Sequence, residues 1–133
     1  MANDDEHLDR SVAERVIALI DATNLADDCT DDDVIALCRS ASGSDGDGGP
    51  TAAVCVYPQF VELARRELSP EVLVATVVNF PAGDDAVDHV LAETEAALAA
   101  GADEIDVVLP YRAFLEDRFD EAAAMIDAVR AVV

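Results

Sequence analysis

Hydrophobic positions along the chain alternate between helical and strand-like spacing. An apolar stripe that recurs every three or four residues opens the chain and leads into a short strand-like segment at residues 20–23. The stripe consists of Leu8, Val12, Val16, Ile17 and Ile20. Three later segments are compact and largely apolar, with many β-branched residues, and they are expected as strands at 51–57, 71–79 and 105–109.

Amphipathic segments between and after these strands are expected as helices. They cover about 31–42, 58–68, 84–100 and 119–133. Thr30 is a favourable N-cap for the first of them, because its side chain can accept a hydrogen bond from a free N–H group of the first turn. Pro58 suits the first position of the next helix, and Gly101 suits the residue that follows a helix end. The glycine-rich segment 42–50 is expected as a loop.

The order strand–helix therefore occurs four times, and it predicts an α/β fold. Strands that are apolar on both faces and separated by helices are typical of a parallel sheet covered by helices. Two architectures fit, an open doubly wound sheet and part of a (β/α)8 barrel. An open nucleotide-binding sheet carries a glycine-rich turn after its first strand, whereas residues 21–25 contain no glycine. This favours the barrel, of which four units are half.

Composition narrows the classes of partner. The chain has 133 residues, which fits one domain, expected to span residues 1–133. Its 29 acidic and 8 basic residues give a formal net charge of −21, which disfavours nucleic acid and anionic membranes. All of the basic residues are arginine. A net charge this negative indicates a halophilic host, because molar salt screens the repulsion between surface charges.

The sequence also predicts a cytoplasmic protein with reduced thiols. Its first residues are acidic where a signal peptide is basic, and the longest apolar run, residues 72–78, is too short to span a bilayer. The three cysteines, Cys29, Cys38 and Cys55, lack metal-ligand spacing. Cys29 precedes an N-cap, a place that can lower the pKa of a thiol. Cys38 and Cys55 lie in core patterns and are interpreted as packing residues.

Asp106 is the most informative polar position, because it interrupts the apolar strand 105–109. A buried carboxylate is costly unless it has a partner, so this residue is either functional or a structural carboxylate bonded to arginine or the backbone. We expect it to be exposed to solvent or paired with Arg112. Asp21 and Thr23 lie two residues apart near the end of the first strand and share one face. They either line a site there or form a turn at the strand exit.

Five segments together resemble the deoxyribose-phosphate aldolase family. They occur in the family's order and with family-like spacing from about residue 8 onward. The segments are IDATNL at 20–25, IALC at 35–38, TAAVCVYP at 51–58, ATVVNFP at 75–81 and GADEIDVVLPYR at 101–112. Each segment is weak evidence alone, but five in order are specific.

The resemblance implies a TIM barrel with class I aldolase activity. Such an enzyme converts 2-deoxy-D-ribose 5-phosphate to D-glyceraldehyde 3-phosphate and acetaldehyde. A lysine forms a Schiff base with the substrate carbonyl, and no metal or other cofactor is used. By the same resemblance, Asp106 corresponds to a catalytic aspartate of the proton relay, Asp21 and Thr23 line the sugar-phosphate pocket, and Cys55 lies beside it.

The chain departs from the family in having no lysine. In the family, the Schiff-base lysine and the phosphate-binding loops belong to the second half of the barrel. The resemblance therefore implies an incomplete barrel of about four βα units with an N-terminal helix, truncated and inactive alone. The alternative is a non-catalytic α/β module that binds a partner or self-associates as a homo-oligomer, because open strand edges favour association.

Overall fold

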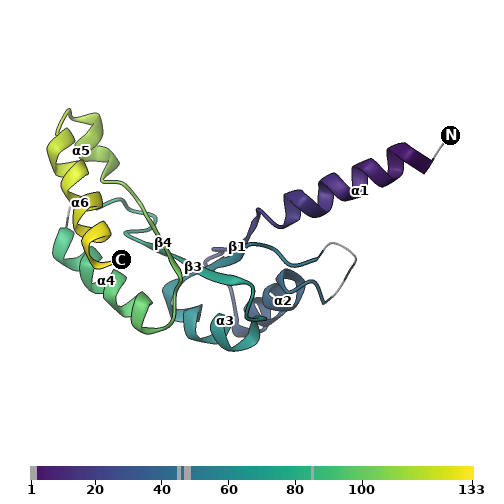
Figure 1. Cartoon of the computed structure of the whole chain (residues 1–133). Helices are drawn as coiled ribbons and strands as arrows, with labels where there is room; N and C mark the ends of the chain where they lie inside the picture. Colours follow the sequence, from purple (N-terminus) through teal and green to yellow (C-terminus); the bar gives the residue numbers. More distant parts are fainter. Residues whose placement is uncertain (1–2, 45, 47–48, 85) are drawn as a thin grey trace.

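The structure is a computed structural model that describes residues 3–44, 46, 49–84 and 86–133, with side chains from residue 10 onward. Four strands alternate with helices along the chain (Figure 1). The strands are β1 (Asp21–Asn24), β2 (Ala53–Val56), β3 (Leu73–Val78) and β4 (Glu104–Val107). The helices are α1 (Asn3–Ile17), α2 (Asp31–Ala41), the 3₁₀ helix η1 (Pro58–Phe60), α3 (Val61–Glu67), α4 (Val87–Ala99), α5 (Tyr111–Leu115) and α6 (Phe119–Val132).

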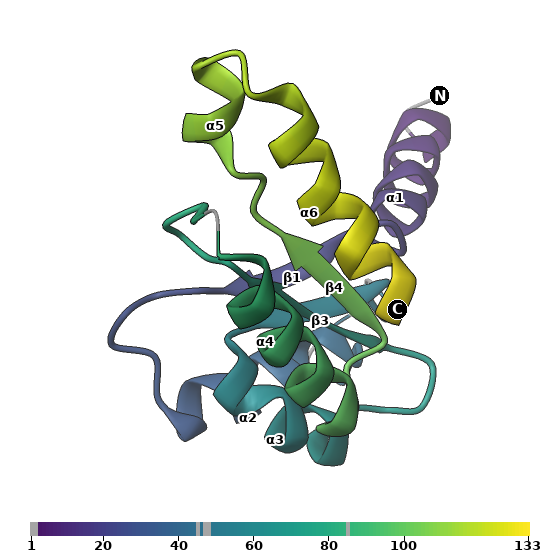
Figure 2. The same ribbon diagram turned by 90° about the vertical axis from the view of Figure 1, so that its left-hand side faces the viewer.

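The strands form a single sheet in the order β1–β2–β3–β4, and all neighbours are parallel. Helices α2, α3 and α4 lie on one side of this sheet (Figure 1). Helix α6 runs beside β4 and packs against α4 (Figure 2). Strands β1 and β4 are the two edges, so the sheet is open. The predicted α/β fold with parallel strands is therefore confirmed.

Most of the apolar core lies between the sheet and its helices. Val54 and Val74 of the strands are completely buried there, together with Cys38 of α2. The prediction that Cys38 is a packing residue is confirmed. A second buried cluster, around Val90 and Met125, joins α4 and α6 to the end of β3.

Helix α1 forms as its apolar spacing predicts, but the apolar stripe remains half exposed. The helix extends away from the sheet beyond β1 (Figure 1). Val12 and Val16 are 50 % and 49 % exposed, and with Leu19 they line an open groove. Within the described residues, the stripe therefore gains little from burial, and the orientation of α1 is not set by a shared core.

Several element boundaries differ from the predicted ones. Strand β1 begins at Asp21, so this residue lies at the start of the strand and not near its end. Helix α4 begins at Val87 and not at Asp84, whose N–H group is bound by the Asn79 side chain. The short helix α5 was not predicted. The expected loop 42–50 falls partly outside the described residues.

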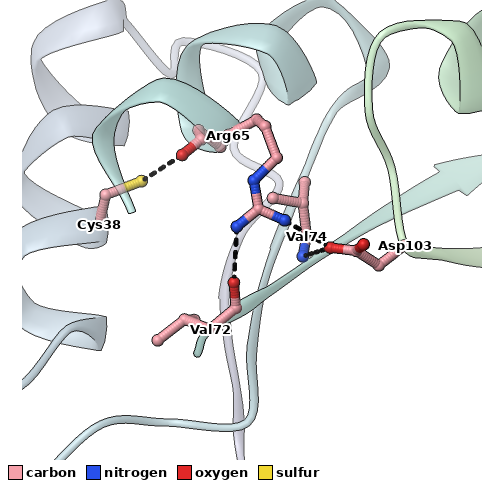
Figure 3. Close-up of polar contacts among 6 residues, drawn as sticks. Cys38, Arg65, Val72, Val74 and Asp103 are labelled. Atoms are coloured by element: carbon pink, nitrogen blue, oxygen red, sulfur yellow. Dashed lines mark hydrogen bonds and ion pairs between the residues drawn. The ribbon is translucent and has the colours of Figure 1, made fainter. Parts of the chain in front are cut away.

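An aspartate–arginine clamp joins the amino ends of β3 and β4 (Figure 3). Asp103 Oδ2 accepts hydrogen bonds from Arg65 Nη1 at 2.7 Å and from the Val74 N–H group at 2.9 Å. Arg65 Nη2 also donates to the Val72 carbonyl at 2.9 Å. The clamp thereby ties α3 to both strands and helps to set the position of β4.

Candidate active site

Alternate residues of the strands point to the side of the sheet opposite α2, α3 and α4. We name this surface the site face. Its residues are Asp21 and Thr23 of β1, Ala53 and Cys55 of β2, Leu73, Ala75 and Val77 of β3, and Glu104 and Asp106 of β4. Four of them, Ala53, Cys55, Ala75 and Val77, form one buried cluster, which confirms that they share a face. The structure thus places all four sequence-predicted site residues on one surface.

Asp106 lies on the edge strand β4 with its side chain exposed. Its Oδ2 atom lies 3.9 Å from Cys55 Sγ, which donates a weak hydrogen bond to it. Ala75 lies on β3 between these two strands, and its small side chain leaves room for the contact. Arg112 instead donates to the Ala82 carbonyl at 2.9 Å. Of the two environments predicted for Asp106, solvent exposure is therefore confirmed.

Cys55 is 4 % exposed, and it remains a protonated thiol at neutral pH. Burial, followed by the negative charges of Asp106 and Asp21, raises the pKa of this thiol to about 11. It is a packing residue that also donates to Asp106. Cys29 precedes the N-cap of α2, a place that can lower the pKa of a thiol, but burial, followed by the charges of Asp33, Asp28 and Asp31, raises its pKa.

The polar residues of β1 make the local bonds that the turn interpretation predicts. Thr23 Oγ1 donates to the backbone carbonyl of Asp21 at 3.0 Å, a local turn-like bond. At the strand exit, Asn24 Oδ1 accepts from the Ala26 N–H group at 3.1 Å. The Asp21 carboxylate also contributes to a raised pKa at Glu104, so it acts electrostatically on the site face.

Glu104 is the site-face residue that sequence reasoning missed. The predicted strand began at Ile105, whereas β4 begins one residue earlier. Burial, a hydrogen bond with Asp106 and the charges of Asp106 and Asp21 raise the pKa of Glu104 above its ordinary value of 4.5. Residues 104–107 alternate acidic and apolar side chains, and this period-2 pattern could have extended the strand.

Asn79 ties together two loops at the carboxyl ends of the strands, where sites of (β/α)8 barrels lie. Its side-chain amide donates to the carbonyls of Asp84 and Val108 at 3.0 and 2.9 Å, and its Oδ1 accepts from the Asp84 N–H group at 2.8 Å. Its own N–H group donates to Glu93 Oε2 at 2.9 Å. With φ of 58°, this residue occupies the left-handed region that asparagine tolerates. The turn after β3 is therefore fixed against the chain that follows β4.

Carboxyl groups and one thiol dominate the chemistry of the site face. No group of three or more His, Cys, Asp or Glu side chains in the described part of the chain is arranged to hold a metal ion. None of the helices formed by the described residues is long and apolar enough to cross a membrane.

A family model for DeoC/LacD family aldolases matches residues 15–132. The match includes all four strands and therefore the complete site face. The chain belongs to the DeoC/LacD aldolase family. Only α1 of this DeoC/LacD chain lies mostly outside the match.

The chain spans about half the length of the solved structures that it matches. A chain from Coccidioides immitis, assigned as a deoxyribose-phosphate aldolase, matches with a TM-score of 0.81 and 30% identity, over 90% of this chain and 46% of that one. A similarly assigned chain from Toxoplasma gondii matches with a TM-score of 0.79 and 28% identity, over 97% and 48%. The tetrameric deoxyribose phosphate aldolase of Aeropyrum pernix matches with a TM-score of 0.67 and 27% identity, over 98% and 56%. The fold is thus an incomplete TIM barrel.

Proposed function

We propose that this chain is the N-terminal half of a deoxyribose-phosphate aldolase and is inactive without a second half-barrel. The complete enzyme would convert 2-deoxy-D-ribose 5-phosphate to D-glyceraldehyde 3-phosphate and acetaldehyde. The observation that carries this proposal is the convergence of Asp106, Cys55 and Glu104 on one face of an open, four-stranded sheet of the aldolase family.

The site face lacks two groups that this reaction needs. Its charged residues, Asp21, Glu104 and Asp106, are all acidic, whereas a sugar phosphate is an anion that requires positive charge. A Schiff base requires an amine such as a lysine whose pKa is depressed, and the sequence contains no lysine. Both groups are therefore assigned to the complementing half.

The residues of this chain supply the remaining chemistry. Asp106 exchanges protons with the substrate or the reacting amine as a general acid and base. Cys55 donates a hydrogen bond to Asp106 and limits its movement. Asp21 and Thr23 line the substrate pocket from β1.

A non-catalytic binding module is the second candidate. The unpaired edges of β1 and β4 and the half-exposed stripe on α1 favour association with another polypeptide. A second copy of this chain could pair with both edges. It would also place its own Asp21, Glu104 and Asp106 opposite the same three groups, and this repulsion favours a more basic partner.

We further propose that the protein works in a cytoplasm of high salt concentration. The support is the formal net charge of −21 and the complete absence of lysine among the basic residues. At molar salt the Debye length is about 3 Å, so carboxylates on the surface repel one another only at close range.

The decisive experiment is complementation with half of a relative. This chain is co-expressed with the part of the Coccidioides immitis aldolase that it does not cover, and acetaldehyde release from 2-deoxy-D-ribose 5-phosphate is measured. We expect turnover by the pair and none by either half. Asp106→Asn in the pair should lower kcat about 10²- to 10⁴-fold, as loss of a general acid–base group does. Asp127→Asn, an exposed change on α6, is the matched control and should leave kcat unchanged.

Trapping with acetaldehyde and borohydride gives a second readout. A covalent adduct is expected on the complementing half alone, because this chain has no lysine. Turnover by the isolated chain, or an adduct on it, would contradict the proposal. A stable complex of the two halves without turnover would support the binding module instead.

A further inference from the structure

We propose that Asn79 is a positioning residue for Asp106: its side chain holds the carboxyl end of the edge strand β4 and thereby sets where the Asp106 carboxylate lies. The catalytic meaning of this inference rests on the proposed function, whereas the hold on β4 can be tested in the isolated chain. Asn79 follows β3 and lies outside the site face, so it acts on Asp106 through the backbone of β4.

Strand β4 has a neighbouring strand on one side only, because it forms an edge of the sheet. Its ladder of backbone hydrogen bonds therefore runs to β3 alone. Just beyond its carboxyl end, the Val108 N–H group donates to the Val78 carbonyl at 3.1 Å. Asp106 lies two residues earlier, about 7 Å along the strand, so a displacement of this end would shift its carboxylate.

The Asn79 side chain adds a second bond at this end of β4. Its Nδ2 group donates to the Val108 carbonyl at 2.9 Å, across a separation of 29 residues in the chain. Val108 is thus held through its N–H group by Val78 and through its carbonyl by Asn79. Asn79 is only 7 % exposed, so this bond is shielded from water, and losing it costs more than losing an exposed one.

The other bonds of Asn79 fix the amide that holds β4. Nδ2 also donates to the Asp84 carbonyl at 3.0 Å, and Oδ1 accepts from the Asp84 N–H group at 2.8 Å. Both hydrogens of the amide are therefore used. The backbone N–H group of Asn79 donates to Glu93 Oε2 of α4 at 2.9 Å. The amide is thereby anchored to the turn after β3 and to α4, which makes it a rigid support.

The turn after β3 and the chain after β4 also meet at other points. Arg112 Nη1 donates to the Ala82 carbonyl at 2.9 Å. The Tyr111 ring lies so close over Gly83 that a β-carbon on this glycine would come within 2.5 Å of its Cδ1 atom. Of these contacts, the bond from Asn79 lies nearest to the end of β4 along the chain. It is therefore the contact that acts most directly on the strand.

The first test follows backbone hydrogen exchange in the isolated chain by NMR, at about 1 M KCl so that surface charges are screened. The Val108 N–H group reports on the carboxyl end of β4. The Asp103 N–H group, which donates to the Val74 carbonyl at 2.8 Å, reports on the amino end. Asn79→Gly permits the left-handed backbone but removes the side chain. We expect exchange at Val108 to become about tenfold faster, as loss of one hydrogen bond implies, with little change at Asp103.

Two further variants separate the bond to β4 from general destabilisation. Asn79→Asp keeps an acceptor for the Asp84 N–H group, but its ionised carboxylate has no donor for the Val108 carbonyl, so exchange at Val108 should again be faster. Thr30→Ala is the control: it removes the N-cap of α2, which packs on β1 and β2, and lowers stability without acting on the end of β4. No acceleration at Val108 in the Asn79 variants, or equal acceleration at both ends of β4, would overturn the proposal.

The second test measures turnover by the complemented pair of half-barrels. Asn79→Gly and Asn79→Asp should lower kcat about tenfold to a hundredfold with a smaller change in KM, because a displaced general acid–base group slows proton transfer more than it weakens binding. Thr30→Ala should keep the wild-type kcat. A wild-type kcat in both Asn79 variants, or a change in KM alone, would count against a positioning role. If the wild-type pair shows no turnover, the proposed function fails, while the exchange measurement still decides whether Asn79 holds the end of β4.

Discussion

Thr30 and Asp33 form a capping box at the start of α2, the helix that packs behind β1 and β2. Thr30 Oγ1 accepts from the Asp33 N–H group at 3.3 Å, and Asp33 Oδ2 accepts from the Thr30 N–H group at 2.9 Å. Each bond satisfies a backbone donor that the first helical turn leaves free. Two polar side chains thereby fix where the helix begins.

Thr30→Ala is expected to lower the free energy of unfolding by about 1 kcal/mol, because an N–H group of the first turn loses its acceptor. Urea denaturation at pH 7 measures the loss. Asp32→Asn is the control, since Asp32 lies in the same turn but outside the capping box. An equal loss in both variants would show that charge near the helix end, and not the cap, is responsible.

The capping box should also make stability depend on pH in the acid range. Hydrogen bonds from the Thr30 hydroxyl and N–H groups lower the pKa of Asp33 below its ordinary value of 3.8. The stability from such a group is complete above the ordinary value and is lost as the pH falls through the lower folded value. Asp33→Asn should therefore reduce the loss of stability below about pH 4. Unfolding curves collected from pH 2 to 6 check this, and an unchanged slope in Asp33→Asn would refute it.

At the scale of elements, the clamp formed by Arg65 and Asp103 connects α3, β3 and the start of β4. One carboxylate oxygen serves both the Arg65 guanidinium and the Val74 N–H group. Asp103 also donates its own N–H group to the Val74 carbonyl at 2.8 Å. Since Glu104 and Asp106 follow directly along β4, the clamp helps to place both carboxyl groups.

Asp103→Ala is expected to lower the free energy of unfolding by about 2 kcal/mol, because a guanidinium and a backbone N–H group lose a charged acceptor. Asp103→Asn should lose less, since its amide oxygen can still accept from Val74. Urea denaturation compares both with Asp127→Asn, which removes an exposed charge on α6. A loss in Asp103→Ala no larger than in Asp127→Asn would contradict a stabilising role for the clamp.

At the scale of the whole molecule, the strong negative charge and the open sheet both lower the stability of the isolated chain. The formal net charge of −21 disfavours compact states through self-repulsion. The unpaired edges of β1 and β4 and the exposed stripe of α1 also leave stabilising contacts unmade within the described residues. The isolated chain therefore depends on conditions that weaken repulsion.

We expect the free energy of unfolding to rise as KCl is increased from 0.1 to 1 M, because the Debye length falls from about 10 to 3 Å over this range. Denaturation in urea at each salt concentration measures the effect. A variant that combines Asp88→Asn, Glu95→Gln and Asp127→Asn removes three exposed charges and should respond less to salt. The same salt response in both proteins would exclude screening as its cause.

The amino-acid sequence predicted the elements well where local rules decide them. The spacing of apolar residues identified the four strands and most helices, since burial of one or both faces imposes a period on the side chains. Thr30 and Gly101 marked helix ends through hydrogen bonding and backbone conformation. The family resemblance, together with the carboxylate in an apolar strand at Asp106, gave the candidate site residues Asp106, Asp21, Thr23 and Cys55, which the structure places on one face of the sheet.

What only the tertiary structure decided were the contacts between residues far apart in the chain. The register of β2, β3 and β4 brings Cys55 to Asp106, whereas a periodic pattern carries no register between strands. The half-exposed stripe of α1 is likewise a feature that only the tertiary structure decided. Its spacing determined that Val12 and Val16 share a helix face, but burial of that face depends on a second surface, which local sequence does not specify.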